Sequence, residues 1–76
     1  MGNAAYKRFR VLVVAERKNA NLTQHALALK LKKPQSFVSK YERGERRLDV
    51  VEFGEVAKGL GVDPIHFLRK FYGEGT

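Results

Sequence analysis

The sequence predicts an all-α fold, a compact bundle of five short helices that forms one domain over residues 1–76. Apolar residues recur at the three- and four-residue spacing of helices, and residues that start or stop helices divide the chain into five such segments. No strand pattern bounded by turn residues competes with this reading. A single domain of this size has a thin margin of stability, and we expect its ends, about 1–3 and 73–76, to be frayed.

The first helix is predicted from about Ala4 to Asn19, and Phe9 and Val13 lie at the centre of its inner face. Asn21 can adopt the left-handed conformation that ends a helix. The inner face also carries Leu12, Glu16, Arg17 and Ala20.

The second helix starts at Thr23, a good N-cap, after Leu22 as a hydrophobic staple. Its inner stripe ends at Leu31, and the turn falls at 32–33, because a residue before proline avoids the helical conformation. The rest of the inner stripe is Leu27 and Ala28.

The third helix is predicted from Pro34 to Arg43, with proline at its first position and Gly44 as its C-terminal stop. Val38 and Tyr41 point to the core, and Phe37 lies at the border.

Asp49 and Glu52 form a capping box that starts a fourth helix, which runs to about Leu60 and ends at Gly61. Asp63 and Pro64 start a fifth helix that runs to about Tyr72. The inner residues expected for the fourth helix are Val50, Phe53, Val56, Ala57 and Leu60.

Composition limits the function. The chain has no cysteine, and His25 and His66 lie far apart, so we expect no metal site, no cofactor and no enzyme activity. No apolar run is long enough to cross a membrane, and no signal peptide is evident, so we expect a cytoplasmic protein. The formal net charge is +7, and seven of the fifteen basic residues lie between 30 and 47, which favours a polyanionic partner over a mere aid to solubility.

The outer face of the third helix is the candidate binding surface. It carries Ser36, Ser39, Lys40 and Arg43, with Gln35 in the first turn. A merely solvated face is usually built from stronger helix formers than serine. Two helices joined by a very short turn form a helix-turn-helix, whose second helix enters the DNA major groove, and Gln, Ser, Lys and Arg can contact base edges there.

The sequence strongly resembles the phage-repressor-type helix-turn-helix family, also called the Cro/C1 or Xre-like family, over about residues 9–68. The motifs that carry the resemblance are Leu22-Thr23-Gln24, Leu27-Ala28, Val38-Ser39-Lys40-Tyr41-Glu42-Arg43-Gly44 and Asp49 to Phe53.

The resemblance implies a five-helix fold whose third helix reads DNA with Gln35, Ser36 and Lys40, and with Ser39 close by. It also implies phosphate contacts, which serve affinity more than specificity. The resemblance assigns phosphate contacts to Gln24, Arg43, Arg46 and Arg47, and we expect Thr23, Lys32 and Lys33 to add to them.

The sequence departs from the family at the turn, where the family usually has glycine in place of Lys32 and an apolar residue in place of Lys33. A left-handed lysine costs about 1 kcal/mol. The two lysines add positive charge beside the reading helix, or the turn itself differs and changes the tilt of that helix.

The resemblance further suggests a partly buried ion pair between Arg17 and Glu42; the alternative is two independent surface charges. On the fifth helix, Phe67, Phe71 and Tyr72 either close the core or contact a second copy in a homodimer. A dimer would place two reading helices on half-sites about one DNA turn apart.

Three functions fit these features. The first is a small transcriptional regulator that binds specific double-stranded DNA. The second is an antitoxin that binds a toxin as well as its own operator. The third is a non-specific nucleic-acid or architectural protein, which would show a steep salt dependence without sequence preference.

Overall fold

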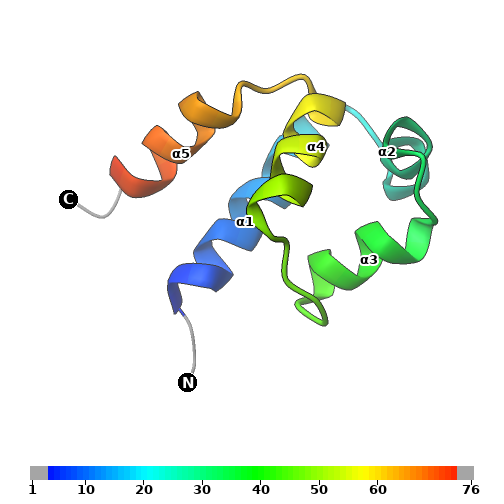
Figure 1. The fold of residues 1–76 in the computed structure, drawn as a ribbon, viewed down its shortest axis with the longest axis horizontal. Coiled ribbons are helices and arrows are strands. Elements are labelled where there is room, and N and C mark those ends of the chain that lie inside the picture. The colour runs from blue at the N-terminus through cyan, green and yellow to red at the C-terminus, as the bar shows by residue number, and fades with distance from the viewer. Residues whose placement is uncertain (1–3, 74–76) are drawn as a thin grey trace.

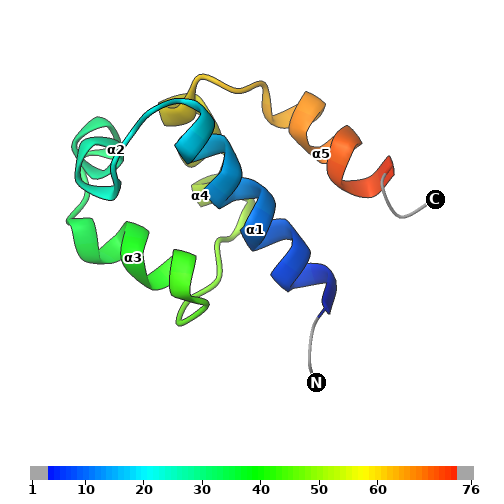
Figure 2. The same cartoon turned by 180° about the vertical axis from the view of Figure 1, so that it is seen from behind.

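The computed structural model describes residues 4–73 and contains five helices and no strand within that range (Figures 1 and 2). The expected all-α fold is confirmed. The expectation of frayed ends at 1–3 and 74–76 lies outside the described residues, whereas Gly73 belongs to the last helix. The helices are α1 (Ala4–Asn19), α2 (Gln24–Leu31), α3 (Gln35–Arg43), α4 (Val50–Leu60) and α5 (Pro64–Gly73).

Local capping interactions define the helix ends. The hydroxyl of Thr23 accepts the amide N–H of Ala26 at 3.0 Å, and Asp49 and Glu52 form both bonds of a capping box at the start of α4. Gly44 and Gly61 end α3 and α4 in the left-handed conformation. These caps were predicted from the sequence because they depend only on neighbouring residues.

The start of α3 differs from the prediction by one residue. Pro34 precedes the helix as its N-cap, with φ −65° and ψ 153°, and its carbonyl accepts the amide N–H of Phe37 at 3.0 Å. Proline therefore supplies an extended backbone and a carbonyl acceptor at this end, whereas the first helical position belongs to Gln35.

The five helices are arranged in two groups at opposite ends of the molecule, with two helices between them. Helices α2 and α3 pack on each other at one end, α5 lies at the other, and α1 and α4 run between them (Figures 1 and 2). Gly59 allows α4 to approach α2 closely, because a Cβ atom at this position would lie 2.9 Å from a methyl carbon of Leu31. Helix α3 lies away from α5 in both views (Figures 1 and 2).

One hydrophobic core links both ends. Phe9 of α1 lies at the centre of an aromatic cluster, with ring centroids 5.3–5.7 Å from Phe53 of α4 and from Phe67 and Phe71 of α5. The helix-turn-helix end adds an aliphatic part around Tyr41. The buried residues of the core are Val13, Leu27, Ala28, Val38, Tyr41, Phe53, Val56, Ala57, Phe67 and Phe71.

The core includes Phe67 and Phe71 and corrects the expectations for Val50 and Ala20. Phe67 and Phe71 are 3% and 9% exposed, so both pack in the core of their own chain, whereas Tyr72 is 68% exposed. Val50 is 78% exposed, because at the first position of α4 it faces a surface groove instead of the core. Ala20 is also exposed, since α1 has already ended at Asn19.

Tyr41 combines deep burial with a polar group that has no partner. The side chain is 1% exposed, and its hydroxyl makes no hydrogen bond among the described residues. Burial, followed by the nearby charge of Glu42, raises the pKa of Tyr41 well above its usual value, because the phenolate cannot be solvated there.

We expect Tyr41→Phe to raise the free energy of unfolding by about 1 kcal/mol, because it removes an unsatisfied buried hydroxyl. The folded pKa exceeds the unfolded value of about 10, so ionisation of Tyr41 does not affect stability below about pH 10 and lowers the free energy of unfolding as the pH rises further. The variant should therefore lose less stability than the wild type between about pH 7 and pH 11.

Urea denaturation followed by circular dichroism measures both effects, with Tyr72→Phe as the control at an exposed tyrosine. A clear loss of stability in Tyr41→Phe would show that the hydroxyl is hydrogen-bonded to a buried water.

Candidate nucleic-acid interface

The candidate interface is the outer face of α3. Gln35, Ser36 and Lys40 have exposed side chains, while Val38 and Tyr41 on the opposite face are 0% and 1% exposed. The helical period of 3.6 residues separates the two sets, as the sequence predicted. Three polar side chains that can donate or accept hydrogen bonds therefore project from one helix face.

Two further residues of this face are less available. Ser39 is half-buried, and its hydroxyl donates a long hydrogen bond of 3.3 Å to the carbonyl of Ser36. Arg43 forms an exposed ion pair with Glu45 at 2.9 Å, and the hydrogen bond from Arg43 lowers the pKa of Glu45. An exposed ion pair contributes little stability, so Arg43 can exchange this partner for a phosphate at small cost.

A half-buried polar network positions α3 against α1 and α2. The guanidinium of Arg17 donates to both carboxylate oxygens of Glu42, at 2.7 and 3.0 Å, and to the carbonyl of Leu22 at 2.7 Å. The side chains of Arg17 and Glu42 are only 12% and 7% exposed. The hydrogen bonds that Arg17 donates to Glu42 raise the pKa of Arg17, and the predicted ion pair is confirmed.

The sequence did not predict two further hydrogen bonds of this network. The side-chain amide of Gln24 donates to Glu42 at 2.9 Å, and the guanidinium of Arg10 donates to the backbone carbonyl of Glu42 at 3.0 Å. One N–H of Gln24 is thus committed inside the protein, and its amide group has a second N–H for a phosphate. The network holds the start of α2 and the end of α3 in one arrangement.

The turn between α2 and α3 keeps helix-turn-helix geometry in spite of its two lysines. Lys32 has φ 59° and ψ 41°, the left-handed conformation that usually favours glycine, and the amide N–H of Lys33 donates to the carbonyl of Ala28 at 3.1 Å. The structure therefore places a lysine in a strained position, at a cost of about 1 kcal/mol.

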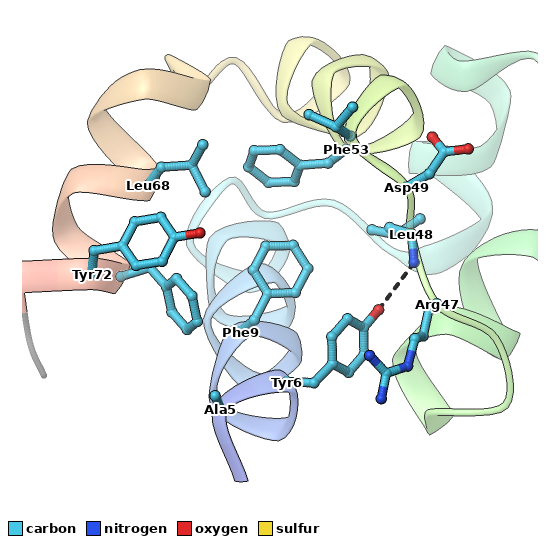
Figure 3. A pocket seen from close by; sticks show the side chains of 11 residues that line it. Ala5, Tyr6, Phe9, Arg47, Leu48, Asp49, Phe53, Leu68 and Tyr72 are labelled. Atoms are coloured by element: carbon cyan, nitrogen blue, oxygen red, sulfur yellow. Dashed lines mark hydrogen bonds between the residues drawn. The ribbon is translucent and has the colours of Figure 1, made fainter. Parts of the chain in front are cut away.

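The expected phosphate-binding arginines separate in space. Arg46 pairs with Glu52 at 2.9 Å near the start of α3, and this bond, followed by one from the Asp49 amide, lowers the pKa of Glu52. Arg47 lies instead with its guanidinium carbon 4.5 Å from the ring centroid of Tyr6, in a groove between α1, α4 and α5 (Figure 3). The structure does not group Arg47 with the cations around α3.

Other kinds of site find no support in the described residues. Between residues 4 and 73 there is no group of three or more His, Asp or Glu side chains that could hold a metal ion. In the same range, no helix has the length and apolar character that crossing a membrane requires.

Comparisons with known proteins point to one family. A helix-turn-helix family model matches residues 14–67. An XRE-family like protein from Pseudomonas syringae pv. tomato str. DC3000 is 44% identical and superposes with a TM-score of 0.94, over 97% of this chain and 90% of that one. A point variant of the restriction–modification controller protein C.Esp1396I is 26% identical with a TM-score of 0.86, over 97% and 94%. No curated protein matches the sequence.

We expect Glu42→Ala to lower the free energy of unfolding by about 3 kcal/mol, because it leaves the half-buried Arg17 and the amide of Gln24 without their acceptor. Glu45→Ala is the matched control: it removes the carboxylate of an exposed ion pair on the same stretch and should leave stability nearly unchanged.

Urea denaturation measures both variants. Replacing both partners, in Arg17→Met with Glu42→Met, should recover part of the loss, since no unpaired charge stays buried. A loss in Glu42→Ala as small as that in Glu45→Ala would show that the network does not hold the fold together.

Proposed function

The chain belongs to the Cro/C1 (XRE-type) helix-turn-helix family of DNA-binding regulators, and from that premise we propose that it recognises a specific double-stranded DNA sequence with α3 in the major groove. The observation that carries the proposal is the set of exposed side chains at Gln35, Ser36 and Lys40, on the face of α3 that no other helix covers. Glutamine suits adenine, lysine suits guanine, and serine accepts several bases.

Contacts to phosphate would hold α3 in the groove. Thr23 and Gln24 lie at the start of α2, where unpaired amide N–H groups favour an anion. Lys32, Lys33 and Arg46 flank the start of α3, and Arg43 lies at its end. We leave Arg47 out of this set, because it packs on Tyr6 away from these residues.

We further propose that two copies pair through the groove shown in Figure 3. The groove, of about 410 Å³, is bordered by α1, α4 and α5, and its large exposed apolar residues are Val50 and Tyr72, at 78% and 68%. Arg47 and Asp49 lie in its lining and offer opposite charges. A surface that carries both signs suits self-association about a twofold axis, where the same patch meets itself.

Binding selection from a pool of random duplexes, followed by sequencing, tests recognition. We expect enrichment of an inverted repeat with half-site centres about one helical turn, roughly 34–36 Å, apart. Binding without enrichment would favour the non-specific alternative, and a toxin that copurifies in stoichiometric amount would favour the antitoxin alternative.

Replacing Gln35, Ser36 and Lys40 together with alanine should lower the preference for the selected site by at least about 100-fold, since base contacts contribute about 1–3 kcal/mol each. The variant should keep its fold and a weaker, salt-sensitive binding to any duplex.

The matched control replaces Lys58, His66 and Arg69, three exposed residues of α4 and α5, with alanine. It should keep the sequence preference. An unfolded triple variant at α3, seen by circular dichroism, would contradict the assignment of that face to DNA.

Sedimentation equilibrium tests the dimer. Tyr72→Lys should shift the chain toward monomer, because it places a charge in the apolar part of the groove. Val11→Lys, at an apolar residue of α1 that is 55% exposed and lies outside this groove, should leave the association unchanged. Wild-type protein that stays monomeric at high micromolar concentration would disprove the pairing.

A further inference from the structure

A second hollow, also of about 410 Å³, lies beside the first turn of α3. It is formed by the turn between α2 and α3, by α3 itself, by the loop that precedes α4 and by the first turn of α4. Its lining combines four cations with one acid and one hydroxyl: Lys32, Lys33, Lys40, Arg46, Glu52 and Ser36.

An aromatic ring positions two of these cations. Lys33 comes from the turn before α3 and Arg46 from the loop after it, yet both lie over the ring of Phe37, at 5.2 and 4.8 Å from its centroid. Phe37 is itself held by an edge contact with Tyr41, with ring centroids 5.6 Å apart. The fold therefore brings positive charges from two segments to one wall of the hollow.

The charges in the hollow are unbalanced. Glu52 is the only acid among the lining residues, and its ion pair at 2.9 Å is with Arg46. One guanidinium nitrogen of Arg46, Nη1, is buried and has no hydrogen-bond partner among the described residues. Clustered like charges and an unpaired buried donor are both unfavourable without an anion.

We propose that this hollow binds one backbone phosphate of the DNA that α3 reads, and that Lys32 and Lys33 make the site. This inference rests on the proposed function and goes beyond it, because it assigns one phosphate to one hollow. Lys32, Lys33 and Arg46 contact the phosphate, while Ser36 and Lys40 line the side of the hollow next to the base-reading face. Lys32 adopts a left-handed backbone conformation that is unfavourable for lysine, and its side chain adds a positive charge to the lining of the hollow.

The test compares the wild type with Lys32→Gly/Lys33→Gln in binding to one fixed duplex over a range of salt. Each lost phosphate contact lowers the slope of log affinity against log salt by about 0.9, so loss of this one phosphate should lower the slope by about 1. Glycine relieves the left-handed strain at position 32, so the variant should melt no lower than the wild type. Loss of affinity then cannot come from unfolding.

The matched control is Lys58→Gln/Arg69→Gln, which removes the same charge from α4 and α5 and should change the slope much less. Glu52→Gln keeps a side-chain oxygen for the Asp49 amide but removes the negative charge from the hollow. It should raise affinity roughly two- to fivefold, because Arg46 no longer has a competing carboxylate.

The outcomes separate the two claims. Wild-type protein that binds no duplex at any salt overturns the proposed function. Wild-type binding with an unchanged slope in the lysine variant overturns only this inference. Titration with inorganic phosphate, followed by the NMR shifts of the Ser36 and Phe37 amides, tests whether the hollow binds a free anion instead. Saturation below millimolar phosphate, together with a DNA affinity that the lysine change leaves unaffected, would assign the hollow to a small phosphate ligand. That result would overturn the DNA assignment.

Discussion

The arrangement of α2 and α3 depends on the hydrogen bonds that the carboxylate of Glu42 accepts. Glu42 lies near the end of α3, is 7% exposed, and accepts hydrogen bonds from Arg17 of α1 and Gln24 of α2. A half-buried charge is stable only when its partners are held at fixed distances and angles. Apolar contacts between α2 and α3 tolerate small slides and rotations, whereas this network does not. The direction in which α3 presents its outer face is therefore set by polar geometry.

The segment between α3 and α4 lies between the two surfaces for which we propose binding roles, and it contributes residues to both. Arg46 turns toward the hollow beside α3, and the next residue, Arg47, turns toward Tyr6 in the opposite groove. The amide N–H of Leu48 donates to the hydroxyl of Tyr6 at 3.0 Å, which fixes the segment to α1 (Figure 3). Glu52 accepts from both Arg46 and the Asp49 amide, so the same carboxylate caps α4 and holds the guanidinium of Arg46. One short segment thus serves both surfaces.

The end of the molecule that carries α2 and α3 has several features that weaken the fold. A lysine occupies a left-handed turn, a buried tyrosine hydroxyl lacks a partner among the described residues, and four cations gather with a single acid beside the first turn of α3. At the other end, Phe9 and three further phenylalanines form a tight aromatic cluster that joins α1, α4 and α5. Strain of this kind is kept at functional sites when the rest of the structure is stable enough to hold it. The unfavourable features therefore lie at the end of the molecule where we propose that DNA binds, and the tightest aromatic packing lies at the opposite end.

The sequence by itself determined the five helices, their caps and the outer face of α3. Capping, left-handed turns and the 3.6-residue period depend on a few neighbouring residues, so Thr23, Gly44 and the Asp49–Glu52 box could be read directly. Only the tertiary structure decided which apolar residues of α5 stay exposed, how Gln24 is used, and that Arg46 and Arg47 point apart. Those outcomes depend on contacts between segments distant in the chain. A helical period cannot show which neighbour covers a face, because that is settled by how all five helices pack together.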